Sequence, residues 1–132
     1  MYVDSLFNYE RRRTRAVRIG HVELGADAPV RVQSMANTDT NDVEQSVAQA
    51  ERVAAVGGEL VRFTTQGVRE AQSIGLIHSA LRAGGCQVPL VADVHFNPHV
   101  AGAAAAVVEK VRINPGNFVA GKQGDYSAAD EA

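Results

Sequence analysis

The chain contains almost no cysteine, and this scarcity excludes several kinds of protein. Cys86 is the only cysteine among 132 residues, so no disulfide can form within the chain. A single thiol is typical of a protein in a reducing compartment. It also cannot supply the three or four ligands of an iron–sulfur cluster or of a cysteine-rich zinc site. We therefore expect neither an iron–sulfur cluster nor a cysteine-rich zinc site to be built by this chain alone.

Long apolar runs and an excess of positive charge are absent as well. No run approaches the roughly 20 apolar residues that cross a bilayer. The first residues show no basic stretch followed by an apolar one, which argues against a secretory signal and for a cytoplasmic location. The formal net charge is −2, whereas general nucleic-acid binders are clearly basic. Neither a membrane nor a nucleic acid is expected as a partner.

The sequence divides into three stretches. Residues 1–16 form a polar, arginine-rich arm, which we interpret as solvated, with an anion site as the alternative. Residues 17–118 carry regular apolar patterns, and residues 119–132 lose them and form an irregular tail. Apolar alternation on both sides of Gly20 predicts a β-hairpin at the start of the middle stretch, suited to the amino-terminal end of a barrel.

Four short apolar runs in the middle stretch each lead into a polar cluster. The runs cover residues 30–32, 60–61, 90–92 and 111–113, and helical patterns lie between them. This order predicts parallel strands joined by helices. Because the carboxyl ends of parallel strands meet on one face, the four clusters are expected to form one pocket.

The predicted helices begin and end at residues typical of helix termini. Asn41 is expected to cap the first, with Glu44 as its capping-box partner, and Asn97 to cap the third, with Pro98 as its first residue. Glycine pairs end the first two helices. The apolar face of the second helix consists of Ala71, Ile74, Ile77 and Leu81.

The number of strands sets the expected fold. A (β/α)₈ barrel takes roughly 250 residues, and this chain shows strands for only about half of one. We predict an α/β fold that is the first half of a TIM-type (β/α)₈ barrel with parallel strands, preceded by a β-hairpin. The middle stretch would then be the amino-terminal part of a barrel in a larger protein.

Two arginines occupy equivalent places, each at the carboxyl end of a predicted strand. The planar forks of Arg62 and Arg112 match phosphate oxygens in pairs, and Asn114, in the loop that follows, can donate amide hydrogens. The alternative is that the arginines pair with acidic residues inside the barrel, because a buried charge must be paired. We interpret both as ligands of a phosphorylated molecule.

Asp93 and His95 alternate along an extended segment, so their side chains are expected on the same side. Such a pair can transfer a proton, contact a hydroxylated substrate or bind a metal, although no third metal ligand is evident. A purely structural role is the remaining alternative. Ser34 and Asn37 are candidate polar lining of the same pocket.

Three motifs resemble the 4-hydroxy-3-methylbut-2-enyl diphosphate synthase family. They are residues 32–38, 88–96 and 112–117, and the resemblance covers about residues 11–118. Residues 63–67 are most similar to the long bacterial and plant form, which carries an extra domain.

The resemblance implies a barrel that binds a diphosphate within a reductase of non-mevalonate isoprenoid biosynthesis. The family opens 2-C-methyl-D-erythritol 2,4-cyclodiphosphate to 4-hydroxy-3-methylbut-2-enyl diphosphate. It uses a [4Fe–4S] cluster, held by three cysteines and a glutamate of a carboxyl-terminal domain and reduced by flavodoxin or ferredoxin. In the homodimer, one subunit's cluster domain caps the other's barrel. The family's barrel-mouth positions match Arg62, Asp93, His95, Arg112 and Asn114.

The chain departs from the family in what it lacks. It has no cluster cysteines, no second half of the barrel and none of the later basic residues of the diphosphate site. We therefore expect the chain alone to be inactive. Two alternatives remain, namely another phosphate-binding barrel similar to dihydropteroate synthase, and a non-catalytic half-barrel that assembles with partners.

Overall fold

A computed structural model describes residues 7–8, 12–95, 97–116 and 118. The predicted tail, 119–132, and most of the predicted arm lie outside these residues. In the part of the chain that is described, no helix combines the length and the apolar character needed to cross a membrane.

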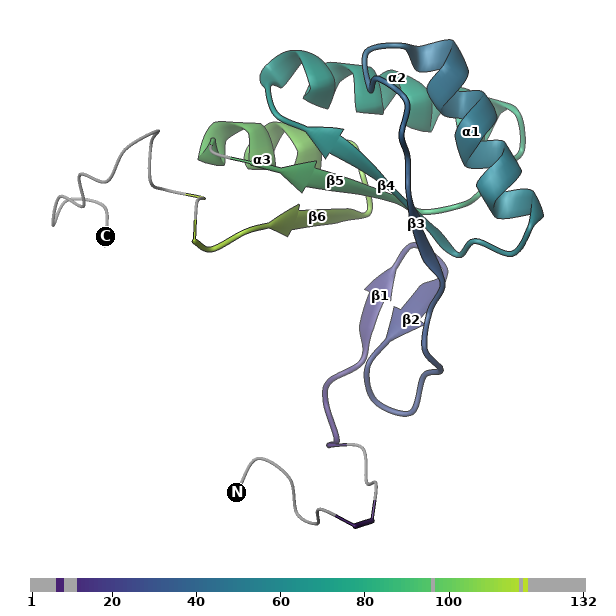
Figure 1. Ribbon diagram of the computed structural model, residues 1–132, viewed down its shortest axis with the longest axis vertical. Coiled ribbons are helices and arrows are strands. Elements are labelled where there is room, and N and C mark those ends of the chain that lie inside the picture. The colour runs from purple at the N-terminus through teal and green to yellow at the C-terminus, as the bar shows by residue number, and fades with distance from the viewer. Residues whose placement is uncertain (1–6, 9–11, 96, 117, 119–132) are drawn as a thin grey trace, which may run out of the picture.

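The described chain forms a four-stranded parallel sheet and a separate two-stranded hairpin (Figure 1). The hairpin consists of β1 (Val17–Ile19) and β2 (Val22–Leu24), and the sheet of β3 (Gln33–Met35), β4 (Leu60–Thr65), β5 (Leu90–Val94) and β6 (Lys110–Ile113). The helices are α1 (Val43–Ala55), α2 (Val68–Ala83) and α3 (Pro98–Ala105). The sheet order β3-β4-β5-β6, parallel throughout, confirms the predicted α/β fold and hairpin.

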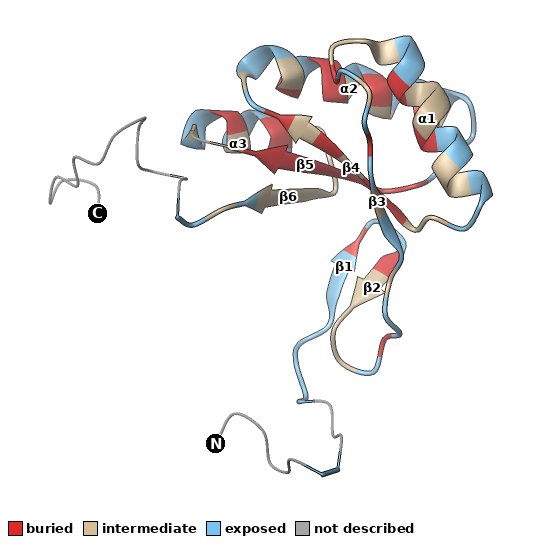
Figure 2. Cartoon of the chain, in the orientation of Figure 1, coloured by how far each residue is buried: buried red, intermediate tan, exposed pale blue. Residues whose placement is uncertain are grey.

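All three helices cover the same face of the sheet (Figure 1). Buried residues gather where they meet β4 and β5 (Figure 2). The predicted apolar face of α2 lies in this core, with Ile74, Ile77 and Leu81 fully buried and Ala71 3% exposed. Burying such side chains contributes about 1.5–3 kcal/mol for each large one, so the helix layer fixes the sheet from one side.

The hairpin packs on the opposite face, at the amino-terminal ends of the strands. Its Ile19 forms an apolar cluster with Leu60 and Val91. Gly20 turns the hairpin with a φ of +59°, where a Cβ would lie 3.2 Å from Cγ of Pro89. Glycine suits both the positive φ and the close approach. The hairpin therefore closes the end of the sheet that is remote from the strands' carboxyl ends.

The first strand of the sheet begins later than predicted. β3 covers Gln33–Met35 rather than 30–32, and Val30 and Val32 are 88% and 58% exposed. The backbone N–H of Val32 donates to the carboxylate of Glu59 (2.8 Å), which also pairs with Arg31 (2.7 Å). The side chain of Glu59 thus takes the N–H of Val32, while the carbonyl of Val32 accepts from the N–H groups of Glu59 and Leu60. Regular strand pairing begins only at Gln33.

The cap of α1 also differs from the prediction. Asp42, not Asn41, caps the helix, and its Oδ1 accepts a hydrogen bond from the N–H of Gln45 (3.1 Å). The amide of Asn41 instead donates to Glu70 (2.7 Å) and accepts from Ser73 (2.9 Å), both on α2. The expected caps of α3 are confirmed: Asn97 accepts from the N–H of His99, and Pro98 is the first helical residue.

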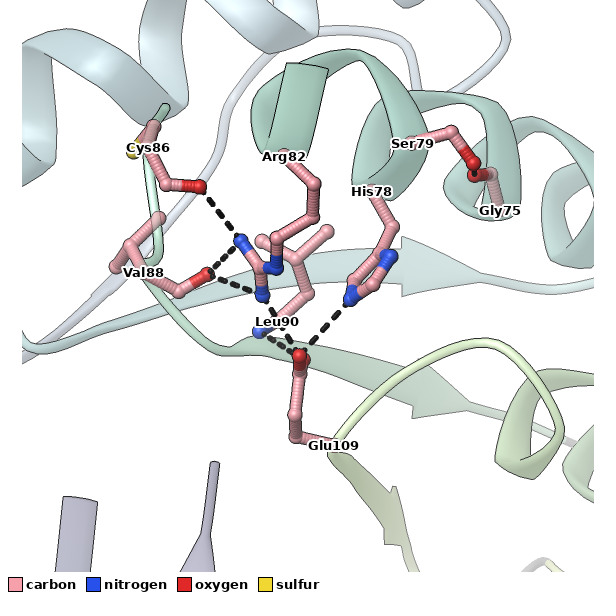
Figure 3. Close-up of polar contacts among 8 residues, drawn as sticks. All are labelled: Gly75, His78, Ser79, Arg82, Cys86, Val88, Leu90 and Glu109. Carbon is pink, nitrogen blue, oxygen red and sulfur yellow. Dashed lines mark hydrogen bonds and ion pairs between the residues drawn. The ribbon is translucent and has the colours of Figure 1, made fainter. Parts of the chain in front are cut away.

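A carboxylate ties α2 to the sheet at its amino-terminal end (Figure 3). Oε1 of Glu109 accepts hydrogen bonds from Arg82 (2.6 Å) and His78 (2.8 Å), and Oε2 accepts one from the N–H of Leu90 (2.9 Å). Burial alone would raise the pKa of Glu109, but these hydrogen bonds outweigh it and hold the pKa below its ordinary value of 4.5. The carboxylate is therefore ionised near neutral pH and joins three elements.

Replacing Glu109 by glutamine is expected to loosen β5. Loss of a hydrogen bond to a charged group removes about 1.5–3 kcal/mol, so exchange at the Leu90 amide should accelerate roughly ten- to a hundredfold. Because the folded pKa is lowered, this stabilisation is present above pH 4.5 and is lost as the pH falls through the folded pKa. Hydrogen exchange over residues 86–94 of the full-length protein measures it. The control Glu44→Gln changes an exposed carboxylate of α1; equal exchange in both variants would contradict the assignment.

Candidate functional site

The face of the sheet opposite the helices carries the charged residues, and we call it the inner face. Side chains alternate along a strand, and Leu60 and Val91, which pack under the hairpin, mark this side. Residues paired in a parallel register project to the same side. The inner face therefore carries Leu60, Arg62 and Thr64 of β4, Val91 and Asp93 of β5, and Lys110 and Arg112 of β6.

Asp93 is the centre of the site. Its side chain is 1% exposed, and Nη2 of Arg62 lies 2.6 Å from its Oδ2. Nη1 of Arg112 donates to its Oδ1 at 2.9 Å. Nε2 of His95 lies 3.9 Å from the same Oδ1. Four of the predicted site residues thus converge, and two guanidinium groups share a single carboxylate.

The charges of the site do not cancel. Two arginines and one carboxylate leave one net positive charge, and the side chains of Arg62 and Arg112 remain 26% and 37% exposed. The pairing expected as an alternative to phosphate binding is therefore present, but it is incomplete. Each guanidinium offers five N–H donors, of which a carboxylate uses only a part. Donors remain that can face an anion.

Both arginines lie within strands, and for Arg62 this differs from the prediction. β4 continues to Thr65, so Arg62 is the third of six strand residues and not part of a terminal loop as expected. Arg62 is in register with Val91, one row below Asp93, and its long side chain extends toward the strand's carboxyl end to reach the carboxylate. The site therefore lies inside the inner face and not only at its rim.

The other predicted residues are placed differently. Asn114 directly follows β6, and its Oδ1 accepts from the N–H of Gly116 (3.1 Å), which shapes the loop beside Arg112. The register pairs Ser34 with Val61, so Ser34 projects toward the helices and away from Arg62. Asn37 is held by α1: its Oδ1 accepts from Nε2 of Gln49 at 2.6 Å. The structure does not bring Ser34 or Asn37 to the arginine pair.

A polar pocket beside the site was not found from the sequence. It has a volume of about 200 Å³ and lies where the chain leaves β3 and β4. It is lined by Thr38, Asp39, Thr40, Thr64, Gln66 and Glu70. A hydrogen bond from Asn41 lowers the pKa of Glu70, so this lining is anionic at neutral pH. The polar residues that follow β3 and β4 in the sequence could have indicated this pocket. Its carboxylates make it unsuited to phosphate.

Metal ligands are not grouped in the described part of the chain. No three His, Cys, Asp or Glu side chains there lie close enough together to hold a metal ion. Cys86 lies between α2 and β5, at the end of the sheet remote from the arginine pair, and is partly buried.

Parallel strands alternating with helices on one face, and a charged site on the other, define part of an α/β barrel domain. The family model described as the GcpE TIM-barrel domain matches residues 14–129. The chain belongs to this family, which confirms the resemblance seen in its motifs.

Bacterial relatives named 4-hydroxy-3-methylbut-2-en-1-yl diphosphate synthase (flavodoxin) match most of the chain. The protein of Bacteroides fragilis (strain ATCC 25285) is 60% identical over 114 residues, 86% of this chain and 18% of the relative. That of Porphyromonas gingivalis is 52% identical over 127 residues, 96% of this chain and 22% of the relative. That of Akkermansia muciniphila is 46% identical over 132 residues, which cover 98% of this chain and 23% of the relative. The chain spans about a fifth of the length of these relatives.

Proposed function

We propose that this chain supplies the diphosphate-binding part of the barrel of a 4-hydroxy-3-methylbut-2-en-1-yl diphosphate synthase. The convergence of Arg62 and Arg112 on the buried Asp93 is the observation that carries the proposal. One carboxylate leaves a net positive charge and spare N–H donors on a face that a closed barrel would shield from water. Charge-assisted hydrogen bonds from arginine to phosphate are short and paired, so a phosphoryl group fits this position.

Asp93 is proposed to position the two arginines. Its two oxygens take one guanidinium each, which fixes the direction in which the remaining N–H groups point. His95 lies beside it, 3.9 Å from Oδ1, and its side chain is 23% exposed. Of Asp93 and His95, His95 is therefore the residue that can contact a ligand and exchange a proton with it. Asn114, two residues beyond Arg112, is proposed to border the same ligand.

The whole protein is proposed to open 2-C-methyl-D-erythritol 2,4-cyclodiphosphate reductively to 4-hydroxy-3-methylbut-2-enyl diphosphate, the product that the names of its relatives carry. Flavodoxin, which those names also carry, is proposed as the electron donor, with ferredoxin as the alternative. A [4Fe–4S] cluster would supply one-electron chemistry. The donors of this chain do not fit such a cluster, because it contains one cysteine. Residues outside this chain are proposed to hold the cluster, in a cytoplasmic homodimer.

Turnover of the cyclic diphosphate by the full-length protein tests the proposal. The protein is reconstituted with iron and sulfide, supplied with reduced flavodoxin and given the cyclic diphosphate. Formation of 4-hydroxy-3-methylbut-2-enyl diphosphate is expected, and none from residues 1–132 alone. A loaded and fully reduced protein that neither binds nor converts this substrate would contradict the proposed function.

A further inference from the structure

Lys110 shares the inner face with the arginine pair. The register aligns Lys110 with Val91 and Val91 with Arg62, so these three residues form one row across β6, β5 and β4. Val91 packs against Ile19 of the hairpin, which places the row on the side away from the helices. Lys110 is thus on the same face as the arginines, one row below Arg112.

The carboxylates nearest to Lys110 in the chain and in the sheet are engaged elsewhere. Both oxygens of its neighbour Glu109 accept hydrogen bonds from α2 or from the N–H of Leu90, on the helix-covered side (Figure 3). Asp93 is paired with Arg62 and Arg112. No carboxylate within residues 12–95 or 97–116 forms an ion pair with Lys110.

The inner face therefore carries three cations and one carboxylate. Along β6, Lys110 lies about 7 Å from Arg112, and across the sheet it lies about 10 Å from Arg62 at standard strand spacings. Its flexible four-carbon stem can pass along Val91 and bring the ammonium group toward the arginines. Lys110 is partly buried even in these residues alone, and a cation enclosed in a barrel requires a negative partner.

We infer that Lys110 is a third cation of the anion-binding site and that it contacts the second phosphoryl group of a diphosphate. The inference rests on the proposed function and extends it. The arginine pair has one net charge and suits one phosphoryl group. A second phosphoryl group, directed toward the hairpin, would meet the ammonium group of Lys110.

The test compares the binding of inorganic pyrophosphate and of inorganic phosphate to the full-length protein by calorimetry. Lys110→Met keeps an apolar stem and removes the charge, and Lys110→Arg keeps the charge. Arg52→Met removes an exposed cation at the end of α1 and is the control for net charge. We expect Lys110→Met to raise the Kd of pyrophosphate about tenfold or more and to change that of phosphate less than threefold. For Lys110→Arg, the Kd values of pyrophosphate and of phosphate should both stay within about threefold of the wild type. Arg52→Met should bind both anions like the wild type.

Other results overturn the inference. Wild-type pyrophosphate affinity in Lys110→Met, with a lower Tm, means that Lys110 pairs with a carboxylate from another part of the protein. Equal losses for phosphate and pyrophosphate mean a general effect on the site. If either of these results is found and Arg62→Ala still weakens pyrophosphate binding, the role of Lys110 is wrong and the proposed diphosphate site is retained. If neither variant alters binding, the diphosphate site itself is wrong.

Discussion

Replacement of Arg62 or Arg112 by alanine is expected to weaken binding of a diphosphate about ten- to a hundredfold in each single variant. Each change removes charge-assisted hydrogen bonds of about 1.5–3 kcal/mol. It also leaves the buried Asp93 with only one guanidinium, so the remaining net charge of the site falls from positive to neutral. A lysine in either place restores the charge but not the planar fork, and should recover affinity only in part.

The measurement is the Kd of pyrophosphate and the KM for the cyclic diphosphate in the full-length protein. Because Arg62 and Arg112 share one carboxylate, the effects of the two substitutions should not add in the double variant. Arg52→Ala, an exposed arginine of α1, is the matched control and should bind like the wild type. Unchanged affinity in both single variants would remove the phosphate assignment and leave the arginines as internal ion-pair partners.

Replacement of Asp93 by asparagine is expected to lower kcat/KM for the cyclic diphosphate about a hundredfold or more. Asparagine keeps the shape of the side chain but loses the charge that holds Arg62 at 2.6 Å and Arg112 at 2.9 Å. Misplacement of binding groups by about 1 Å is enough to reduce a rate by roughly two orders of magnitude. The two guanidiniums would also repel each other without the carboxylate, so we expect the Tm to fall as well.

Rates are therefore measured per folded molecule, with the Tm recorded for each variant. Asp39→Asn, which neutralises an exposed carboxylate of the neighbouring pocket, is the control for charge, and Asp93→Glu tests whether charge alone restores part of the rate. Normal turnover per folded molecule in Asp93→Asn, together with a lowered Tm, would assign Asp93 a structural role only.

Local patterns predicted the order of the elements correctly. The spacing of Ala71, Ile74, Ile77 and Leu81 places them on one side of a helix whatever that helix packs against, and all four are buried. The Asn97 cap and the Pro98 start of α3 are likewise local, since they depend on neighbouring backbone groups. The motifs indicated more than the order of the elements, because their residues resemble those of one family.

The local pattern did not decide which of two neighbouring polar residues caps α1. Asn41 and Asp42 are both good caps, and the choice fell to Asp42 because Glu70 and Ser73 hold the amide of Asn41. Those partners lie 29 and 32 residues further along the chain. The start of β3 was missed for a similar reason, since the carboxylate of Glu59 accepts the hydrogen bond of the Val32 N–H.

The sequence by itself indicated which residues are candidates for the chemistry and which strands bear them. Alternation along one extended segment was enough to put Asp93 and His95 on one side, and the occurrence of Arg62 and Arg112 at the ends of two apolar runs indicated a shared site, although the register places the two arginines in different rows. Only the tertiary structure decided how these side chains meet, because contact across strands depends on register. A shift of one residue sends a side chain to the other face of a sheet. Register is what joins both arginines to Asp93, turns Ser34 toward the helices and adds Lys110 to the inner face.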